Sequence, residues 1–249
     1  MAVADAAIAV ENLSVAYRGK TALAGLSGCF AAGSLTAVVG PNGAGKSSLL
    51  RALAGLLPPQ SGRVICPALA EGALAYLPQQ ADIDRGFPVT VSELVALGAW
   101  RAYGAFRAAP AAVLARVRAA AAQTGLNDLL GREISALSVG EFQRALFARL
   151  LLQDASVILL DEPFAAVDEQ TTLDLIAVLR RLNAEGRTIV AVLHDLEQAR
   201  GLFPEALLLA RGAIAWGVAA DVLTSANLAR ARAALRAPDR ANAMAQAAA

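Results

Sequence analysis

The sequence is poor in histidine and cysteine and has almost no net charge. It has one His, two Cys, 22 Lys plus Arg and 21 Asp plus Glu, which gives a formal charge of +1 over 249 residues. Cys29 and Cys66 lack a CxxC spacing, which excludes a disulfide framework and a structural zinc site and favours reduced cytoplasmic thiols. Because the net charge is nearly zero, the chain has no broad positive electrostatic field that would attract a nucleic-acid backbone. We therefore expect no nucleic-acid partner.

Long uninterrupted apolar runs are also lacking, although 57% of the residues are hydrophobic and the mean hydropathy is +0.50. The longest charge-free run, 21–45, contains several glycines and Pro41, which would break a spanning helix and leave backbone groups unpaired in lipid. The first ten residues have no basic segment before an apolar stretch, so we expect no secretory signal. These absences predict a protein without a transmembrane helix that stays inside the cell.

Strand and helix patterns alternate along most of the chain. Apolar alternation predicts short strands between Ile8 and Tyr17, broken around Glu11-Asn12. Further strands are predicted at 34–39, 63–66, 73–77, 157–160, 188–193, 206–209 and 213–216, and helices at 46–56, 140–152, 171–183 and 196–202. This alternation favours an α/β sheet.

The region 91–137 differs from the rest of the chain. It offers helix patterns at 91–98 and 110–124 and no convincing strand, which predicts an all-helical insert. Another helix is predicted around 228–235. The Ala-rich, low-complexity tail from Pro238 onward is expected to fray.

A glycine-rich motif lies at 40–47. Its sequence fits G-x-x-x-x-G-K-[ST], directly after an apolar strand pattern and directly before a helical one, which is the context that the motif requires. The glycines let several backbone N–H groups face one point, and the helix adds its positive N-terminal end, so a polyphosphate site is predicted. Lys46 would contact the outer phosphates and the Ser47 hydroxyl would join the shell of Mg²⁺. The residues of this predicted site are Gly40, Pro41, Asn42, Gly43, Ala44, Gly45, Lys46, Ser47 and Ser48.

A second candidate site follows the apolar run 157–160, which ends in Asp161-Glu162-Pro163. A buried parallel strand delivers its last carboxylates to the C-terminal edge of the sheet, where a phosphate loop also opens. Asp161 is therefore predicted to hold Mg²⁺, and Glu162 to polarise an attacking water as general base. Taken alone, this sequence would indicate a solvated acidic turn.

Between these sites lies Leu137-Ser138-Val139-Gly140-Glu141-Phe142-Gln143-Arg144. Here the chain resembles the ATPase subunits of ATP-binding cassette (ABC) transporters, whose signature motif is usually LSGGQ followed by a QR pair. The resemblance covers about residues 8–235 and implies an α/β fold: a P-loop NTPase core with a small antiparallel β subdomain and a helical insert. It implies one ABC ATPase domain over 1–237, with a RecA-like core at about 8–88 and 138–220, a helical subdomain at about 89–137 and a disordered tail at 238–249.

The resemblance also implies roles for single residues. Gln79 resembles the Q-loop glutamine that touches Mg²⁺ and the water, with a plain polar loop residue as the alternative. His194 resembles the switch histidine that steadies the γ-phosphate, with an ordinary satisfied residue at a strand end as the alternative. Asp168 resembles the D-loop aspartate. Tyr17 resembles the aromatic residue that stacks on adenine, with simple packing as its alternative.

The resemblance also implies a homodimer in which ATP lies between one phosphate loop and the other protomer's signature motif. Ser138 and the backbone N–H of Gly140 would then meet the γ-phosphate across the interface. Val139 replaces the usual first glycine of the pair and Glu141 the usual glutamine. Because Val is β-branched, either the backbone there needs no positive φ or the site is altered.

The resemblance further implies a peripheral subunit on the cytoplasmic face of the inner membrane, with ATP and Mg²⁺ as cofactors and integral-membrane permease subunits as partners. The segment 82–91 and the run 161–168 resemble the branch that imports zinc or manganese, which adds an extracytoplasmic metal-binding protein as an indirect partner. An ABC ATPase for another cargo and a soluble, non-transport ABC ATPase remain the alternatives. Phe87, Val89 and Trp100 are predicted to anchor a short permease helix, with burial in the insert as the alternative for Trp100.

Overall fold

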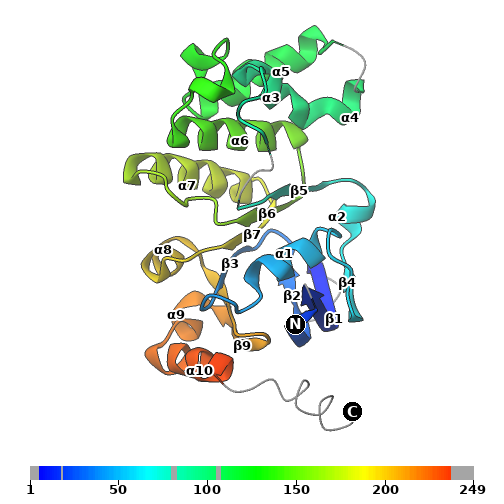
Figure 1. The fold of residues 1–249 in the computed structure, drawn as a ribbon, viewed down its shortest axis with the longest axis vertical. Coiled ribbons are helices and arrows are strands. Elements are labelled where there is room, and N and C mark those ends of the chain that lie inside the picture. The colour runs from blue at the N-terminus through cyan, green and yellow to red at the C-terminus, as the bar shows by residue number, and fades with distance from the viewer. Residues whose placement is uncertain (1–5, 18, 80–82, 105–107, 237–249) are drawn as a thin grey trace. The chain divides into compact units, whose positions relative to one another are not determined.

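The computed structural model describes residues 6–17, 19–79, 83–104 and 108–236 (Figure 1). The chain divides into two compact units. The first comprises Met1–Phe30, Leu35–Ile65 and Val192–Ala249, and the second Ala31–Ser34 and Cys66–Ala191. The predicted tail at 238–249 lies outside the described residues, and the predicted division into a core and a helical subdomain stays a prediction.

A three-stranded sheet in the first unit has the order β2-β1-β4, formed by β1 (Ala6–Tyr17), β2 (Lys20–Ala31) and β4 (Ser61–Ile65). β1 and β4 are antiparallel. The predicted break in β1 is wrong, because the strand continues through Asn12 with an irregular register between Glu11 and Ser14. Asn12 has a φ of 47° and donates its N–H to Ser27 Oγ at 2.9 Å, so a bulge replaces the break.

A second group of strands in the first unit places β8 (Glu205–Leu209) between β3 (Leu35–Val39) and β9 (Ala213–Val218). β3 and β8 are parallel, whereas β8 and β9 are antiparallel. All five residues of β3 are buried, as expected of a strand covered on both faces. The helices of this unit are α1 (Lys46–Leu53), α8 (Leu196–Leu202), α9 (Ala219–Val222) and α10 (Ser225–Arg236).

The strands of the second unit adjoin in the order β5-β6-β7, with β5 at Leu74–Leu77, β6 at Val157–Asp161 and β7 at Thr188–Val192. β5 and β6 are parallel, and β6 and β7 are buried along their whole lengths. The last residue of β7 belongs to the first unit. Helices α2 (Pro67–Ala70) and α7 (Glu169–Ala184) also belong to the second unit. The buried apolar run at 157–160 therefore forms the predicted strand.

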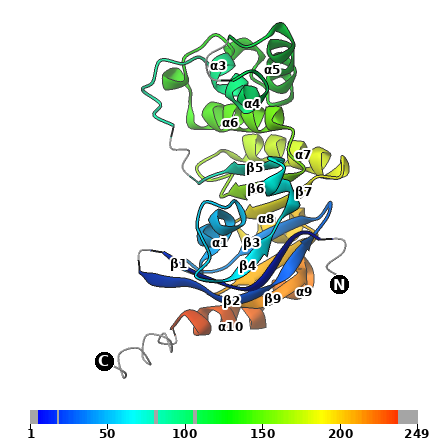
Figure 2. The ribbon, with the colours of Figure 1, turned by 90° about the vertical axis from the view of Figure 1, so that its right-hand side faces the viewer.

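The remaining helices of the second unit gather around α6 (Val139–Gln153), as Figure 2 shows. They are α3 (Val91–Ala96), α4 (Trp100–Tyr103) and α5 (Ala111–Gln123), with short 3-10 turns at Leu97–Ala99, Asn127–Leu129 and Ile134–Ala136. α3 and α5 contact α6 directly. Among the described residues of 91–137 there is no strand, in agreement with the predicted all-helical insert. Within the described parts of the chain, no helix is both long and apolar enough to cross a bilayer.

Candidate functional site

The phosphate loop in the first unit is shaped by close approaches of its own backbone. A Cβ at Gly40 would lie 2.2 Å from the carbonyl oxygen of Leu209, the last residue of β8. A Cβ at Gly45, whose φ is 95°, would lie 2.3 Å from the carbonyl oxygen of Ala22. Only glycine avoids these overlaps, so the turn between β3 and α1 depends on both positions.

Hydrogen bonds hold the loop in this shape. The Ala44 N–H donates to Pro41 at 3.1 Å, and the Ala44 carbonyl accepts from the Arg211 N–H at 2.9 Å. The Leu49 N–H donates to Gly45 at 2.8 Å and continues the first turn of α1. Asn42 and Gly43 at the tip are exposed. The loop thus presents an open tip on a base that is fixed by backbone bonds.

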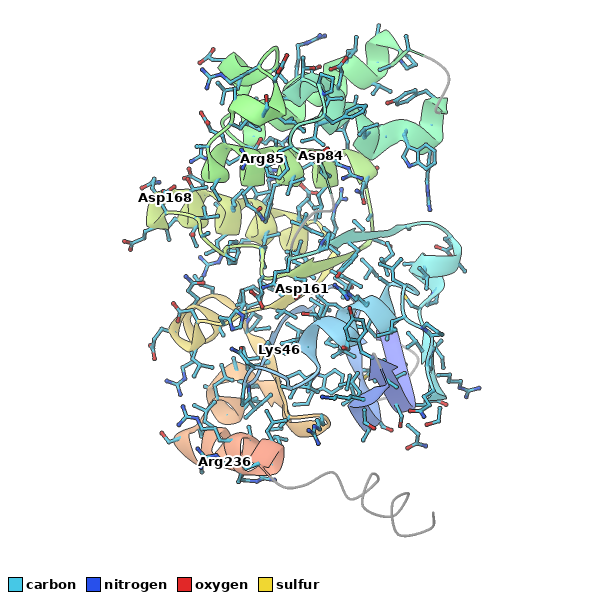
Figure 3. The ribbon with its side chains drawn as sticks, viewed as in Figure 1. Lys46, Asp84, Arg85, Asp161, Asp168 and Arg236 are labelled. Carbon is cyan, nitrogen blue, oxygen red and sulfur yellow. The ribbon has the colours of Figure 1, made fainter. Side chains whose placement is uncertain are left out.

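Lys46 is only 6% exposed at the start of α1 (Figure 3). Its ammonium donates to the carbonyl oxygens of Gly40 at 2.9 Å and Pro41 at 3.3 Å. These bonds compensate a buried charge that would otherwise be costly. Ser47 and Ser48 follow in the same turn and are half-buried. The predicted phosphate residues 40–48 are therefore gathered in one loop and helix start.

Two other predicted residues lie in the first unit. Tyr17 ends β1 with its side chain exposed, and the Arg51 guanidinium carbon lies 5.7 Å from its ring centroid. His194 is exposed and follows Leu193, whose N–H donates to Val38 of β3 at 3.1 Å. Asp195 then caps α8. His194 is thereby held between the end of a strand and a helix start.

The acidic pair lies at the end of β6 in the second unit. Asp161 is labelled in Figure 3 and is the last residue of β6. It is 1% exposed, whereas Glu162 is half-buried and has a φ of 53°. A left-handed backbone is costly for a residue with a Cβ, and strain of this kind concentrates at functional sites. Gln79 Nε2 donates to Glu162 Oε2 at 2.6 Å. The structure therefore brings together the predicted Q-loop glutamine and the predicted general base.

The signature sequence begins α6. Ser138 is the N-cap: its Oγ accepts from the Glu141 N–H at 3.2 Å, and its own N–H donates to Glu141 Oε2 at 2.8 Å. These bonds form a capping box. The bonds from Ser138, first its N–H and then its hydroxyl, lower the pKa of the Glu141 carboxyl, and Arg132 and Arg144 lower it further. Glu141 thus stabilises the helix start in place of the usual glutamine.

Val139 is the first residue of α6 and has helical backbone geometry. Of the two alternatives, a backbone without a positive φ and an altered site, the structure therefore agrees with the first. No positive φ is needed there, so a β-branched residue fits. Its side chain is exposed. A Cβ at Gly140 would meet its nearest atom, Asp168 Oδ2, at 3.4 Å, an ordinary contact.

Asp168 is the N-cap of α7 and adjoins the signature motif (Figure 3). Its Oδ1 accepts from the Thr171 N–H and its Oδ2 from the Thr171 hydroxyl, both at 2.8 Å, and these bonds lower the pKa of Asp168. An open cavity of about 520 Å³ lies here between the signature and D-loop sequences. It is lined by Ser138, Val139, Gly140, Glu141, Ala166 and Asp168, among others.

Two residues tie the signature helix to its neighbours without having been given a role from the sequence. Gln143 Nε2 donates to the carbonyl of Pro163 at 2.7 Å, beside the acidic pair. Arg144 donates to Asp174 at 2.8 Å and to the Thr171 hydroxyl at 3.1 Å. The QR pair that follows the signature sequence is the signal that could have identified both.

The predicted Mg²⁺ ligands have suitable chemistry. Ser47, Gln79 and Asp161 offer hydroxyl, amide and carboxylate oxygens, the hard donors that Mg²⁺ prefers. The Gln79 amide nitrogen donates to Glu162, so its oxygen is the atom that could act as a donor to a metal. Each of the three side chains therefore has a donor atom of the kind that Mg²⁺ prefers.

Comparisons with known proteins identify the family of the chain. The family described as ABC transporter matches residues 23–165. The chain is 38% identical over 229 residues to the zinc transport system ATP-binding protein TroB of Treponema pallidum, covering 90% of this chain and 86% of that protein. It is 35% identical over 225 residues to the manganese transport system ATP-binding protein MntB of Bacillus subtilis, covering 89% and 90% of the two chains.

Solved structures give the same family. A protein described as an ABC transporter of the metal-chelate type, in an inward-facing conformation, superposes with a TM-score of 0.81 at 28% identity, covering 92% of this chain and 89% of that one. The cbiO1 protein of Clostridium perfringens, part of the ABC transporter complex cbiONQ, superposes with a TM-score of 0.75 at 26% identity, covering 96% and 99%. Together with the motifs at 40–47, 137–144 and 157–162, these matches show that the chain belongs to the ABC transporter family and is an ATP-binding, ATP-hydrolysing member of it.

Proposed function

We propose that this chain is the ATPase subunit that energises an importer of a transition-metal ion, zinc or manganese. The observation that supports this cargo most strongly is the similarity to zinc and manganese transport ATP-binding proteins over about nine-tenths of the chain. The resemblance of segment 82–91 to the metal-importing branch agrees with it. Through integral-membrane permease subunits, the chain would act on the cytoplasmic face of the membrane, with an extracytoplasmic metal-binding protein delivering the ion.

In this proposal the phosphate loop binds the polyphosphate of ATP. Lys46 exchanges the carbonyls of Gly40 and Pro41 for phosphate oxygens, and the N–H groups at the start of α1 add their positive end. Ser47, Gln79 and Asp161 would hold Mg²⁺, which, when bound, neutralises part of the phosphate charge. Tyr17 would stack on adenine.

Hydrolysis would depend on Glu162 and the side chains around it. The Gln79 amide, 2.6 Å away, fixes the Glu162 carboxylate, which orients an attacking water and accepts its proton. His194 would donate to the γ-phosphate from the end of β7. The left-handed backbone at Glu162 agrees with this assignment, because strained residues concentrate at functional sites.

The active form would be a homodimer in which each ATP meets the signature motif of the second protomer. Ser138 and the Gly140 N–H lie at the N-terminal end of α6, where an anion is stabilised. Asp168 and the cavity of about 520 Å³ beside the signature motif would face the same interface. ATP binding would close the dimer, and hydrolysis with phosphate release would reopen it.

The permease would bind the helical insert of the second unit. Phe87 is 61% exposed and Trp100 50% exposed, so the alternative that buried Trp100 in the insert is wrong. Val89, two residues after Phe87, is half-buried. Exposed aromatic side chains of this size are the usual anchors of protein interfaces.

Replacement of Glu162 tests the enzymatic part of the proposal. Glu162→Gln should retain ATP binding and lower the hydrolysis rate by a factor of about 10² to 10⁴, because a general base contributes on that scale. Glu71→Gln, an exposed carboxylate at the end of α2, is the matched control and should hydrolyse normally. Normal hydrolysis by Glu162→Gln would contradict the base assignment.

Deletion of the gene tests the cargo. Cells without the protein should grow poorly in chelator-treated medium and contain less zinc or manganese, and the supply of one of these ions should restore growth. Reintroduction of the wild-type chain should also restore growth, whereas the Glu162→Gln variant should not. Rescue by neither metal would contradict metal import and favour another cargo. Co-purification with ribosomes or DNA in place of membranes would favour the non-transport alternative.

A further inference from the structure

Residues 89–92 are hydrogen-bonded to the stretch that leads into the signature motif. The Val91 N–H donates to Arg132 at 2.9 Å, the Ser92 N–H to Leu130 at 2.9 Å, and the Ile134 N–H to Val89 at 3.0 Å. Between these bonds, Thr90 and Glu133 form an antiparallel bridge. The 3-10 turn Ile134–Ala136 then leads directly to the signature sequence.

Arg85 extends this connection onto the signature motif itself (Figure 3). Its Nη2 donates to the carbonyl of Leu137, and its guanidinium carbon lies 4.8 Å from the ring centroid of Phe142. Leu137 precedes the N-cap of α6, and Phe142 belongs to the first turns of that helix. One planar cation therefore contacts the chain on both sides of Ser138.

The local backbone presents Arg85 in this position. Asp84 Oδ1 accepts the Gly86 N–H at 2.9 Å, which closes a turn around Arg85. Phe87 is the last residue of this turn, because its N–H donates to the carbonyl of Asp84 at 3.0 Å. Its exposed side chain is the one assigned above to the permease contact. A displacement of the 84–87 turn would therefore be transmitted to the start of α6.

We propose that Arg85 is a positioning residue that fixes the signature motif and links it to the permease-binding turn at 84–87. This inference rests on the proposed function, because it requires that the signature motif binds ATP held by a second protomer. Arg85 itself touches no nucleotide. It holds the Ser138 hydroxyl and the Gly140 N–H in the direction from which they bind the γ-phosphate.

The proposal predicts that Arg85→Ala changes dimerisation by ATP and leaves the monomer's affinity for nucleotide unchanged. A general loss of structure would weaken both. The phosphate loop of a monomer does not involve Arg85, so its affinity for nucleotide should be unchanged by Arg85→Ala. Closure of the dimer by ATP uses the signature motif and should be weakened. Loss of a coupling contact of this kind changes an equilibrium by about tenfold.

The experiment uses the full chain in the Glu162→Gln background, in which ATP is not consumed. Mass is measured by light scattering while MgATP is increased, and binding to the monomer is measured with a fluorescent ATP analogue. Adding Arg85→Ala should raise the ATP concentration at half-dimerisation about tenfold without changing the monomer affinity. Arg85→Lys retains a cation and a donor and should restore part of the loss.

Arg116 supplies the matched control, because its Nη2 donates to the carbonyl of Leu152 at the other end of α6, at 2.9 Å. Arg116→Ala should leave half-dimerisation unchanged. If Arg85→Ala lowers the melting temperature, Phe142→Leu removes the ring and keeps the apolar bulk, and it should raise the half-dimerisation concentration in the same direction.

Three results would overturn the proposal. The first is that Arg85→Ala and Phe142→Leu both reach half-dimerisation at the same ATP concentration as the Glu162→Gln parent. The second is that Arg116→Ala raises this concentration as much as Arg85→Ala does. In either case the proposed function would stand. Failure of the Glu162→Gln parent to dimerise with ATP would overturn this inference and the homodimer proposal together, so the two failures are distinguishable.

Discussion

The phosphate loop and the signature motif are both helix N-termini, but they are built in different ways. In the loop, the chain's own backbone leaves no room for a Cβ at Gly40 or Gly45. At the signature motif, Gly140 has ordinary space around it, and the helix start is held by the Ser138–Glu141 capping box.

This difference separates requirements of folding from requirements of binding. Gly40 and Gly45 of the phosphate loop are explained by contacts within the chain. Gly140 is not, which agrees with the proposal that ATP held by a second protomer approaches the end of α6. Substitutions at the two places should therefore affect stability and activity in different proportions.

The largest effect is expected for Gly40→Ala. Its Cβ would overlap the Leu209 carbonyl oxygen, 2.2 Å away, and the backbone would have to move. The free energy of unfolding should fall by about 2–3 kcal/mol, and ATP binding should be lost. Urea unfolding measures the loss of stability, and nucleotide titration measures the loss of ATP binding. Gly43→Ala, which has no atom within 4 Å, is the control and should cost only the strain of a positive φ, about 1 kcal/mol. Equal losses in the two variants would contradict the steric explanation.

Gly140→Ala should show the opposite pattern. Alanine is a better helix former than glycine, so the free energy of unfolding should rise by up to about 1 kcal/mol. Hydrolysis should fall about a hundredfold, because a small displacement of the γ-phosphate contacts is enough for that loss. Steady-state ATPase rates and urea unfolding on the same preparation provide the comparison. A stable variant with the parent's ATPase rate would remove the binding explanation for Gly140.

A smaller effect is expected for Ser138→Ala, which removes the N-cap of α6. The free energy of unfolding should fall by about 1 kcal/mol. Thr90→Ala removes the equivalent cap of α3, where the Glu93 N–H donates to Thr90 Oγ1 at 3.3 Å, and should cost a similar amount. ATPase activity should fall in Ser138→Ala and not in Thr90→Ala. A parallel loss of activity in both variants would indicate damaged folding in place of a lost phosphate contact.

The smallest effect is a dependence of stability on acid pH. The pKa of Glu141 is lowered below its ordinary 4.5, chiefly by the Ser138 N–H, so its charged form is favoured in the folded chain. Its contribution to stability is complete above that pH and is lost as the pH falls through the lowered folded-state pKa. The free energy of unfolding of the parent should therefore fall more steeply below about pH 4 than that of Glu141→Gln. Equal slopes for the two proteins would contradict this contribution.

The sequence predicted those parts of the fold that depend on local patterns. The helix at 196–202 has the predicted bounds, and the buried strands β3 and β6 match their apolar runs within one residue, because periodicity and burial coincide there. The predicted break at Glu11-Asn12 is wrong because Ser27, 15 residues away, supplies the hydrogen bond that lets β1 continue. A distant partner of this kind leaves no local pattern.

The same reason limits what could be predicted of the site. The phosphate loop, the acidic pair and the signature motif are contiguous sequences. The first two were predicted from their own residues, and the signature motif from its resemblance to the ABC family. The contacts of Arg85 with Leu137 and Phe142 join residues more than 50 positions apart, and they became visible only in the folded chain. The Gln79–Glu162 hydrogen bond was likewise not predictable from spacing.

The central claim is that ATP joins two copies of this chain through the phosphate loop of one and the signature motif of the other. Its most direct test is the mass of Glu162→Gln in solution with and without MgATP, beside the double variants with Lys46→Ala and with Gly140→Ala. The account predicts that ATP raises the mass from 25.5 kDa to about twice that value, and that either added substitution prevents the change. A Glu162→Gln chain that binds MgATP and remains at 25.5 kDa would contradict it.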